Sequence, residues 1–107
     1  MKGYQVTFFT QQDRRHGRKP MAEWLIQTAR ELGLRGATSL AAAEGFGHHG
    51  RIHSAHFFDL ADQPQEVVLA VTQEELDRLF EHLRKEKVHL FFVKSEVEFG
   101  VIGEPDA

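Results

Sequence analysis

The fold of this chain is decided by residues 67–76, which read Val67-Val68-Leu69-Ala70-Val71-Thr72-Gln73-Glu74-Glu75-Leu76. The continuous apolar run 67–71 predicts a central strand that is buried on both faces. Thr72, followed three residues later by Glu75, has the capping-box pattern that begins a helix. Apolar residues then recur at helical spacing, at Leu76, Leu79, Phe80 and Leu83. A buried strand that leads directly into an amphipathic helix is therefore the basic unit of the fold.

The N-terminal half of the chain repeats this unit. Residues 4–9 alternate in the manner of a strand. Pro20 suits the first turn of a helix, where its missing N–H costs nothing. The apolar face of this helix comprises Met21, Trp24, Leu25, Thr28, Ala29 and Leu32. We expect Trp24 to lie in the core and Gly33 to close the helix in the left-handed conformation.

Further strands complete the pattern. Residues 37–44 indicate a second strand, residues 55–60 a returning strand, and the alternation from Val93 to Val101 a last strand. The order β-α-β-loop-β-α-β predicts an α+β, ferredoxin-like sandwich, in which an antiparallel sheet carries two helices on one face. We expect aromatic residues to cover the open face of the sheet, namely Phe8, Phe9, Phe91, Phe92 and Phe99. A homotrimer that turns these faces inward would bury them.

Length and composition exclude several classes of protein. The chain has 107 residues, a formal net charge of −3 and no cysteine. The length predicts a single domain over residues 1–107. The charge argues against a nucleic-acid binder, because affinity for phosphate backbones needs a basic excess, and the lack of cysteine excludes disulfides. No signal peptide and no apolar stretch near the roughly 18 residues of a membrane span are visible, so we expect a cytoplasmic protein without membrane insertion.

A basic segment precedes the first helix. Residues 13–19 hold four positive charges against one negative, the cations being Arg14, Arg15, Arg18 and Lys19. One interpretation is a solvated loop. The other is a site that captures an anion, because free N–H groups at a helix start favour phosphate or carboxylate and arginine can bind either in a bidentate way.

A glycine- and histidine-rich segment follows the second predicted strand. Gly45 and Gly47 allow the backbone to approach a ligand or a neighbouring chain closely. Its histidines could ligate a divalent metal, and they are His48, His49, His53 and His56. If residues 53–60 are extended, His53 and His56 lie on opposite faces, which argues against one site within a chain. Arg51 and His53 are better candidates for contacts with an anion or a partner.

Four motifs in order carry a resemblance to a known family. They are His16-Gly17-Arg18-Lys19-Pro20, Gly33-Leu34-Arg35-Gly36-Ala37-Thr38, Gly45-Phe46-Gly47 and Arg51-Ile52-His53-Ser54-Ala55. With these motifs the chain resembles the PII signalling proteins and, more closely, the PII-like family known as domain of unknown function 190. The resemblance extends from residue 4 to about residue 102.

The resemblance implies a trimer with effector clefts between its subunits. In PII proteins these clefts hold adenine nucleotides, and Gly-Phe-Gly opens a long T-loop that contacts target proteins. Here the corresponding arm would be residues 45–63. The chain departs from PII after its second helix, where Arg84-Lys85-Glu86-Lys87 replaces a glycine- and lysine-rich loop. The basic C-terminal stretch of PII is also absent.

The residues and the resemblance together leave three functions to consider. The first is a regulator that binds a small anionic effector, with an adenine nucleotide as one candidate, and acts on a target protein such as a membrane transporter. Its effector contacts would be Arg14, Arg15, Arg18, Lys19, Gly45, Phe46, Gly47, Arg51 and His53. The alternative is a metal-binding trimer similar in fold to the CutA proteins. An enzyme is not expected, since Ser54 beside histidines is the nearest approach to a hydrolase nucleophile.

Overall fold

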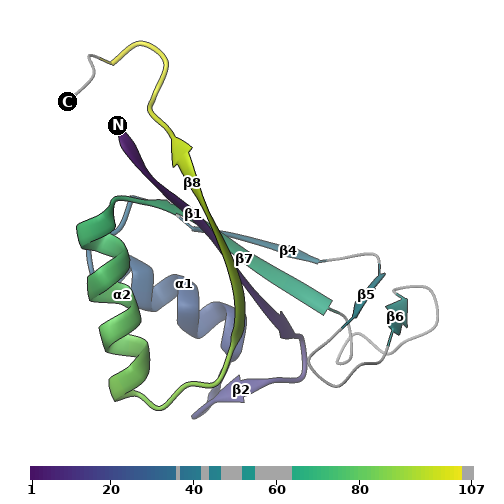
Figure 1. Ribbon diagram of the computed structural model, residues 1–107. Helices are drawn as coiled ribbons and strands as arrows, with labels where there is room; N and C mark the ends of the chain where they lie inside the picture. The colour runs from purple at the N-terminus through teal and green to yellow at the C-terminus, as the bar shows by residue number, and fades with distance from the viewer. Residues whose placement is uncertain (36, 42–43, 47–51, 55–63, 105–107) are drawn as a thin grey trace.

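A four-stranded antiparallel sheet forms the centre of the molecule (Figure 1). The computed structural model describes residues 1–35, 37–41, 44–46, 52–54 and 64–104, with side chains for 1–35 and 64–104. The strands lie in the order β4-β7-β1-β8, and every neighbouring pair is antiparallel. Their bounds are β1 (Lys2–Gln11), β4 (Ala37–Ala41), β7 (Pro64–Val71) and β8 (Phe91–Glu98).

Both helices lie on the same side of this sheet, as Figure 1 shows. They are α1 (Met21–Glu31) and α2 (Gln73–Lys85). Two small hairpins stand apart from the sheet: β2 (Arg15–His16) pairs with β3 (Lys19–Pro20), and β5 (Glu44–Phe46) pairs with β6 (Ile52–Ser54). This arrangement confirms the predicted ferredoxin-like fold. Neither helix of the described chain is long and apolar enough to span a bilayer.

The core lies between the sheet and the two helices. Val67, Leu69 and Val71 of β7 are buried there, whereas Val68 and Ala70, on the opposite face, are half-buried. The prediction that β7 is buried on both faces is therefore wrong for the chain by itself. Residues 67–71 are all apolar, but the two helices of one chain cover only one face of the sheet.

The aromatic residues divide between the two faces of the sheet. Phe8 pairs in register with Phe92, and both contact Phe80 of α2, with ring centroids 6.1 and 4.9 Å away. The assignment of Phe8 and Phe92 to the open face is thus wrong. Phe9 and Phe91, one residue along each strand, lie on the open face with their rings 5.5 Å apart.

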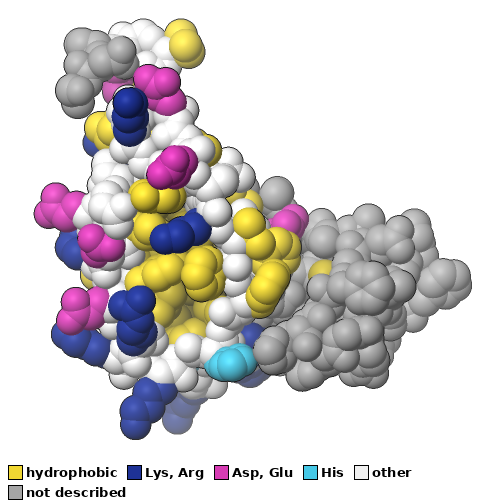
Figure 2. All heavy atoms as spheres, viewed as in Figure 1, with side chains coloured by type: hydrophobic (Ala, Val, Ile, Leu, Met, Phe, Trp, Pro, Cys, Tyr) yellow, Lys and Arg dark blue, Asp and Glu magenta, His cyan; other side chains and the backbone are white. Residues whose placement is uncertain are grey.

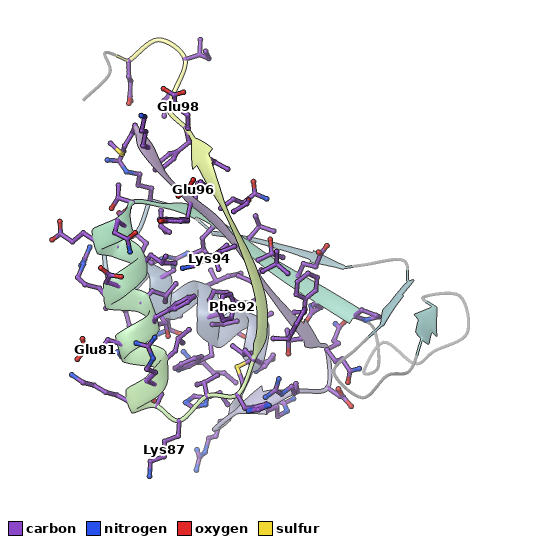
Figure 3. The ribbon with its side chains drawn as sticks, viewed as in Figure 1. Glu81, Lys87, Phe92, Lys94, Glu96 and Glu98 are labelled. Carbon is purple, nitrogen blue, oxygen red and sulfur yellow. The ribbon has the colours of Figure 1, made fainter. Side chains whose placement is uncertain are left out.

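Strand β8 is an edge of this sheet and is exposed along most of its length. Apolar side chains gather in Figure 2 between α2 and β8, with Lys, Arg, Asp and Glu around them. In Figure 3 Phe92, Lys94, Glu96 and Glu98 follow one another along β8. On the open face Phe91 and Val93 are 57% and 50% exposed. The apolar part of β8 is therefore its beginning, and the charged part is its end.

Several predicted strand limits change. The second strand, expected over 37–44, ends at Ala41, and Glu44 belongs to the β5–β6 hairpin. The returning strand is Ile52–Ser54, while the expected span 55–60 lies outside the described residues. The last strand begins at Phe91 instead of Val93 and ends at Glu98. The pairing of β8 with β1 explains its early start, because Phe91 and Phe92 face Phe9 and Phe8.

The helix ends follow local sequence signals. Thr72 and Glu75 form the predicted capping box, in which the Glu75 N–H donates to Thr72 Oγ1 and the Thr72 N–H to Glu75 Oε1. Gly33 adopts the predicted positive φ of 74° after α1. Lys87 takes the same place after α2 with a φ of 57°, although its side chain makes this conformation costly. Both helix ends have the same two backbone hydrogen bonds. After α1 the N–H groups of Gly33 and Leu34 donate to the carbonyls of Arg30 and Ala29. After α2 the N–H groups of Lys87 and Val88 donate to the carbonyls of Arg84 and Leu83.

The two helix ends form a matched pair for a stability test. Replacing Lys87 by glycine removes the left-handed strain, so Lys87→Gly should raise the free energy of unfolding by about 1 kcal/mol in urea denaturation. Gly33→Ala, at the equivalent position of α1, should lower it by a similar amount of about 1 kcal/mol. Equal losses for both variants would contradict this account.

Candidate functional site

The basic segment 14–20 is a hairpin. Arg15 lies opposite Pro20 and His16 opposite Lys19, so Gly17 and Arg18 form the turn. Gly17 has a φ of 64°, as the first position of such a two-residue turn requires. The Met21 N–H donates to the Arg14 carbonyl at 2.8 Å, which joins the base of the hairpin to the start of α1. The predicted basic loop is therefore ordered by backbone bonds, and we call residues 14–20 the basic hairpin.

The cations of the basic hairpin differ in their partners. The Arg14 guanidinium donates to the His89 carbonyl, and the Lys19 ammonium donates to Gln27 Oε1 of α1. Arg15 Nη1 donates to the Arg18 carbonyl at 2.9 Å across the turn. Arg18 is exposed, and its guanidinium has no hydrogen-bond or ion-pair partner among the residues that the structure describes. Arg14 and Lys19 thus hold the hairpin in place, while Arg18 in the turn and Arg15 on the first strand are exposed to solvent.

His16 fixes the same hairpin to the end of α2. Its Nε2 lies 3.1 Å from Glu86 Oε1, and its ring centroid lies 4.0 Å from that of Trp24. The ring of His82 stacks near Trp24, 6.3 Å away. Trp24 is half-buried and packs against the core, so it lies at the edge of the core and not inside it as predicted. His82, through its ring, and His89, through its backbone carbonyl, also contribute contacts here.

A second basic segment is brought to the hairpin by these contacts. Arg14 reaches the carbonyl of His89 and His16 reaches Glu86, so residues 84–89 lie against the hairpin. Arg84 lies over the ring of Phe80, 6.0 Å from its centroid, and Lys85 pairs with Glu81 at 3.5 Å. Figure 3 shows Lys87 at the end of α2, pointing away from the body. Positive charge from both segments therefore gathers at one end of the sheet.

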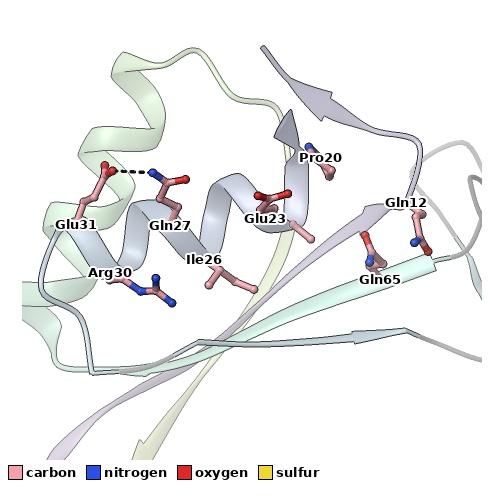
Figure 4. A pocket seen from close by; sticks show the side chains of 9 residues that line it. Gln12, Pro20, Glu23, Ile26, Gln27, Arg30, Glu31 and Gln65 are labelled. Carbon is pink, nitrogen blue, oxygen red and sulfur yellow. Dashed lines mark hydrogen bonds between the residues drawn. The ribbon is translucent and has the colours of Figure 1, made fainter. Parts of the chain in front are cut away.

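A pocket of about 640 Å³ opens beside the hairpin along α1 (Figure 4). Its lining comes from α1, the end of β3, the residue after β1 and the start of β7. It consists of Gln12, Pro20, Ala22, Glu23, Ile26, Gln27, Arg30, Glu31 and Gln65. Gln27 Nε2 donates to Glu31 Oε1 at 3.1 Å, and Gln27 Oε1 accepts from Lys19, so one wall is a chain of polar contacts. The pocket offers amides and both signs of charge.

Sequence reasoning missed this pocket. The positions of Glu23, Gln27 and Arg30 at helical spacing indicate a shared face of α1. Gln12 and Gln65, however, meet that face only through the pairing of β1 with β7, in which Gln11 lies opposite Pro64. No local pattern in the sequence gives that register.

The glycine- and histidine-rich segment is described only in part. Gly45 pairs with His53 and Phe46 with Ile52 in the β5–β6 hairpin, and their side chains are outside the described set. The predicted contacts Gly47 and Arg51, and the candidate metal ligands His48, His49 and His56, lie outside the described residues altogether. Over the described part of the chain, no cluster of three or more His, Cys, Asp or Glu side chains could hold a metal. The metal hypothesis on the loop histidines therefore stays a prediction.

Solved structures of other proteins share this architecture. CPII, a nitrogen regulatory PII-like protein from Thiomonas intermedia K12 bound to ADP, AMP and bicarbonate, matches with a TM-score of 0.69 at 17% identity, over 94% of this chain and 91% of that one. A putative PII-like signalling protein from Thermus thermophilus matches with a TM-score of 0.65 at 17% identity, over 90% and 87% of the two chains. At such identities these matches show the shared fold.

Sequence comparison shows the family. A UPF0166 protein of Aquifex aeolicus (strain VF5) is 32% identical over 80 residues, which make up 74% of this chain and 76% of that protein. The model of an uncharacterized ACR family, domain of unknown function 190, matches residues 3–99. From this match over nearly its whole length, the chain belongs to the uncharacterized ACR family, domain of unknown function 190.

Proposed function

We propose that the chain is a PII-like regulator that binds a small anionic effector at the basic hairpin, with an adenine nucleotide as the first candidate. The observation that carries this proposal is the solvent-facing pair Arg15 and Arg18 on a hairpin that Arg14 and Lys19 hold in place. Preorganised cations bind anions better than mobile ones, because less conformational entropy is lost. The similar fold of CPII, whose structure holds ADP, AMP and bicarbonate, supports this class of ligand.

The second basic segment supports the same conclusion. PII proteins hold phosphates with a glycine- and lysine-rich loop after the second helix, which this chain lacks. Here the contacts of Arg14 with His89 and of His16 with Glu86 bring the hairpin to that same connection. We infer that the hairpin takes over part of the phosphate-binding role, with arginine forks in place of backbone amides.

The proposal includes a homotrimer. Phe91 and Val93 are 57% and 50% exposed on the open face, and the ring of Phe91 lies next to that of Phe9. An apolar face of this kind favours burial against further copies. Because β8 begins beside the basic hairpin, copies that meet along this face would place hairpins at their seams, where a cleft between subunits can hold the effector.

The arm, residues 45–63, would carry the signal. Its base is the β5–β6 hairpin, in which Gly45 lies opposite His53. Gly47 and Arg51 complete the proposed effector contacts from this side. Effector binding would select one arrangement of the arm and so change its affinity for a target protein, for which a membrane transporter is one candidate. In this role the chain acts in the cytoplasm by binding and not by catalysis.

Effector binding is tested by calorimetry with ADP and AMP as the probes. We expect ADP to bind the wild type, and Arg18→Ala to weaken binding roughly tenfold, or about 1.4 kcal/mol, through loss of a charge-assisted contact. Arg78→Ala is the matched control, because Arg78 donates to the Leu32 carbonyl at the other end of α1. Flat titrations with both nucleotides, or equal losses for the two variants, would contradict the proposed site.

Assembly is tested by light scattering on purified protein. The wild type should have three times the 12.2 kDa mass of the chain. Val93→Glu places a charge on the open face and should give monomers, because a carboxylate buried without a partner is strongly unfavourable. Lys94→Glu changes the neighbouring residue on the helix side and should leave the trimer intact. A wild-type monomer at micromolar concentration would exclude the trimer.

A further inference from the structure

The pocket along α1 is lined by two rows of side chains on one face of the helix. Residues four apart lie one above the other on a helix. One row is polar and consists of Glu23, Gln27 and Glu31. The other row consists of Ala22, Ile26 and Arg30. In Figure 4 Gln12 and Gln65 lie at the end of the pocket where α1 begins, and Arg30 and Glu31 lie at the other end.

The lining carries charges of both signs. It contains two carboxylates and one guanidinium, and the Lys19 ammonium stands behind one wall, where it donates to Gln27 Oε1. A simple anion in the pocket would meet the carboxylates, and a simple cation would meet Arg30. The pocket differs in this respect from the basic hairpin. Its electrostatic complement is a ligand with one charge of each sign.

The two charged groups that can pair with such a ligand stand at opposite ends of the pocket. Glu31 Oε1 already accepts from Gln27 at 3.1 Å. The Glu23 carboxylate and the Arg30 guanidinium have no hydrogen-bond or ion-pair partner within the described part of the chain. Their separation of seven residues corresponds to about 10 Å along a helix. A ligand that reaches both groups must therefore have its own charges well apart.

The groups between these two ends suit a peptide bond. Gln12, Gln27 and Gln65 each carry an amide that can both donate and accept. Ile26 is half-buried and offers apolar contact in the middle of the pocket. An extended dipeptide is about 7 Å long, and a hydrogen bond of about 2.9 Å at each end allows it to span the pocket. A free α-amino acid joins its two charges through one carbon and is too short.

A buried hydroxyl beside the pocket points to a ligand at the same end. Thr10 is 7% exposed, and its Oγ1 has no hydrogen-bond partner among the described residues. Thr10 lies opposite Gln65 in the register of β1 with β7, so their Cβ atoms are about 5 Å apart on one face of the sheet. Buried polar atoms are normally paired. A peptide N–H or carbonyl that enters beside Gln65 can supply the partner.

We propose that this pocket binds an extended dipeptide, with its ammonium group at Glu23 and its carboxylate at Arg30. The peptide bond then lies along Ile26, where the glutamine amides hold it. Its first residue lies beside Gln65 and Thr10. The pocket is a second site, separate from the basic hairpin, and the proposal does not depend on the effector of that hairpin.

Binding is tested by NMR titration of the full chain with L-alanyl-L-alanine. We expect saturating shifts of the Ile26 backbone amide and the Gln27 side-chain amide, with a dissociation constant of about 1 mM or tighter. Acetylation of the peptide amine or amidation of its carboxylate should each weaken binding roughly tenfold, because each removes one charge-assisted contact. Shifts that fail to saturate at the highest soluble peptide concentration would overturn the proposal.

The two ends are assigned by combining protein variants with the blocked peptides. Glu23→Gln should bind the free and the acetylated peptide equally well and still discriminate against the amidated one. Arg30→Gln should lose discrimination at the carboxylate and keep it at the amine. If both variants weaken all three peptides by one common factor, the proposed orientation is wrong.

Glu74→Gln and Arg78→Gln are the matched controls on α2. Glu74 stands in the first turn of α2 as Glu23 does in α1, so both substitutions remove the same favourable interaction with a helix N-terminus. The two controls should bind L-alanyl-L-alanine as the wild type does. A loss as large as that of Glu23→Gln or Arg30→Gln would show that binding follows overall charge and not this pocket.

Thr10→Val separates binding from folding. Removal of an unpaired buried hydroxyl should leave the free protein at least as stable in urea denaturation. The same variant should bind L-alanyl-L-alanine about threefold more weakly, because the peptide loses a neutral hydrogen bond. Wild-type affinity in Thr10→Val would contradict the placement of the peptide beside Gln65.

Discussion

The pairing of β1 with both of its neighbours is the constraint on which the rest of the structure depends. In this register Phe8 lies opposite Val67 on one side and Phe92 on the other. A shift of one residue would turn every side chain of β1 to the opposite face, so burial of Val6 and Phe8 beneath the helices fixes it. The same antiparallel register brings the end of β1 next to the starts of β7 and β8. The basic hairpin and the connection after α2 therefore meet at one end of the sheet.

Much of the fold could be predicted because its signals are local. The capping box at Thr72 and the glycine at position 33 are short patterns with a direct physical cause, and both were found as expected. The errors arose where a long-range fact was needed. Phe8 and Phe92 were assigned to the wrong face because hydrophobicity alone does not say which side of a strand the helices cover. Lys87 adopts a left-handed conformation that no local residue pattern predicts.

The candidate site was predictable in composition but not in geometry. Counting charges finds the basic segment, yet which of its cations are available depends on partners 70 or more residues away, His89 for Arg14 and Glu86 for His16. The same holds for Trp24, whose helical spacing suggests the core: it packs against the core and also contacts two imidazoles, those of His16 and His82. Tertiary contacts, which the sequence does not give, separate the cations that hold the hairpin from those that face solvent.

The apolar beginning of β8 lies directly after the segment that contacts the basic hairpin. Phe91 follows His89 by two residues, and the His89 carbonyl accepts from Arg14. Whatever covers Phe91 and Val93 must therefore come close to the cations as well. Under the proposed function, self-association and ligand capture share one piece of surface, so dilution would weaken both by mass action. The concentration of this chain in the cell would then help to set how strongly it responds to its ligand.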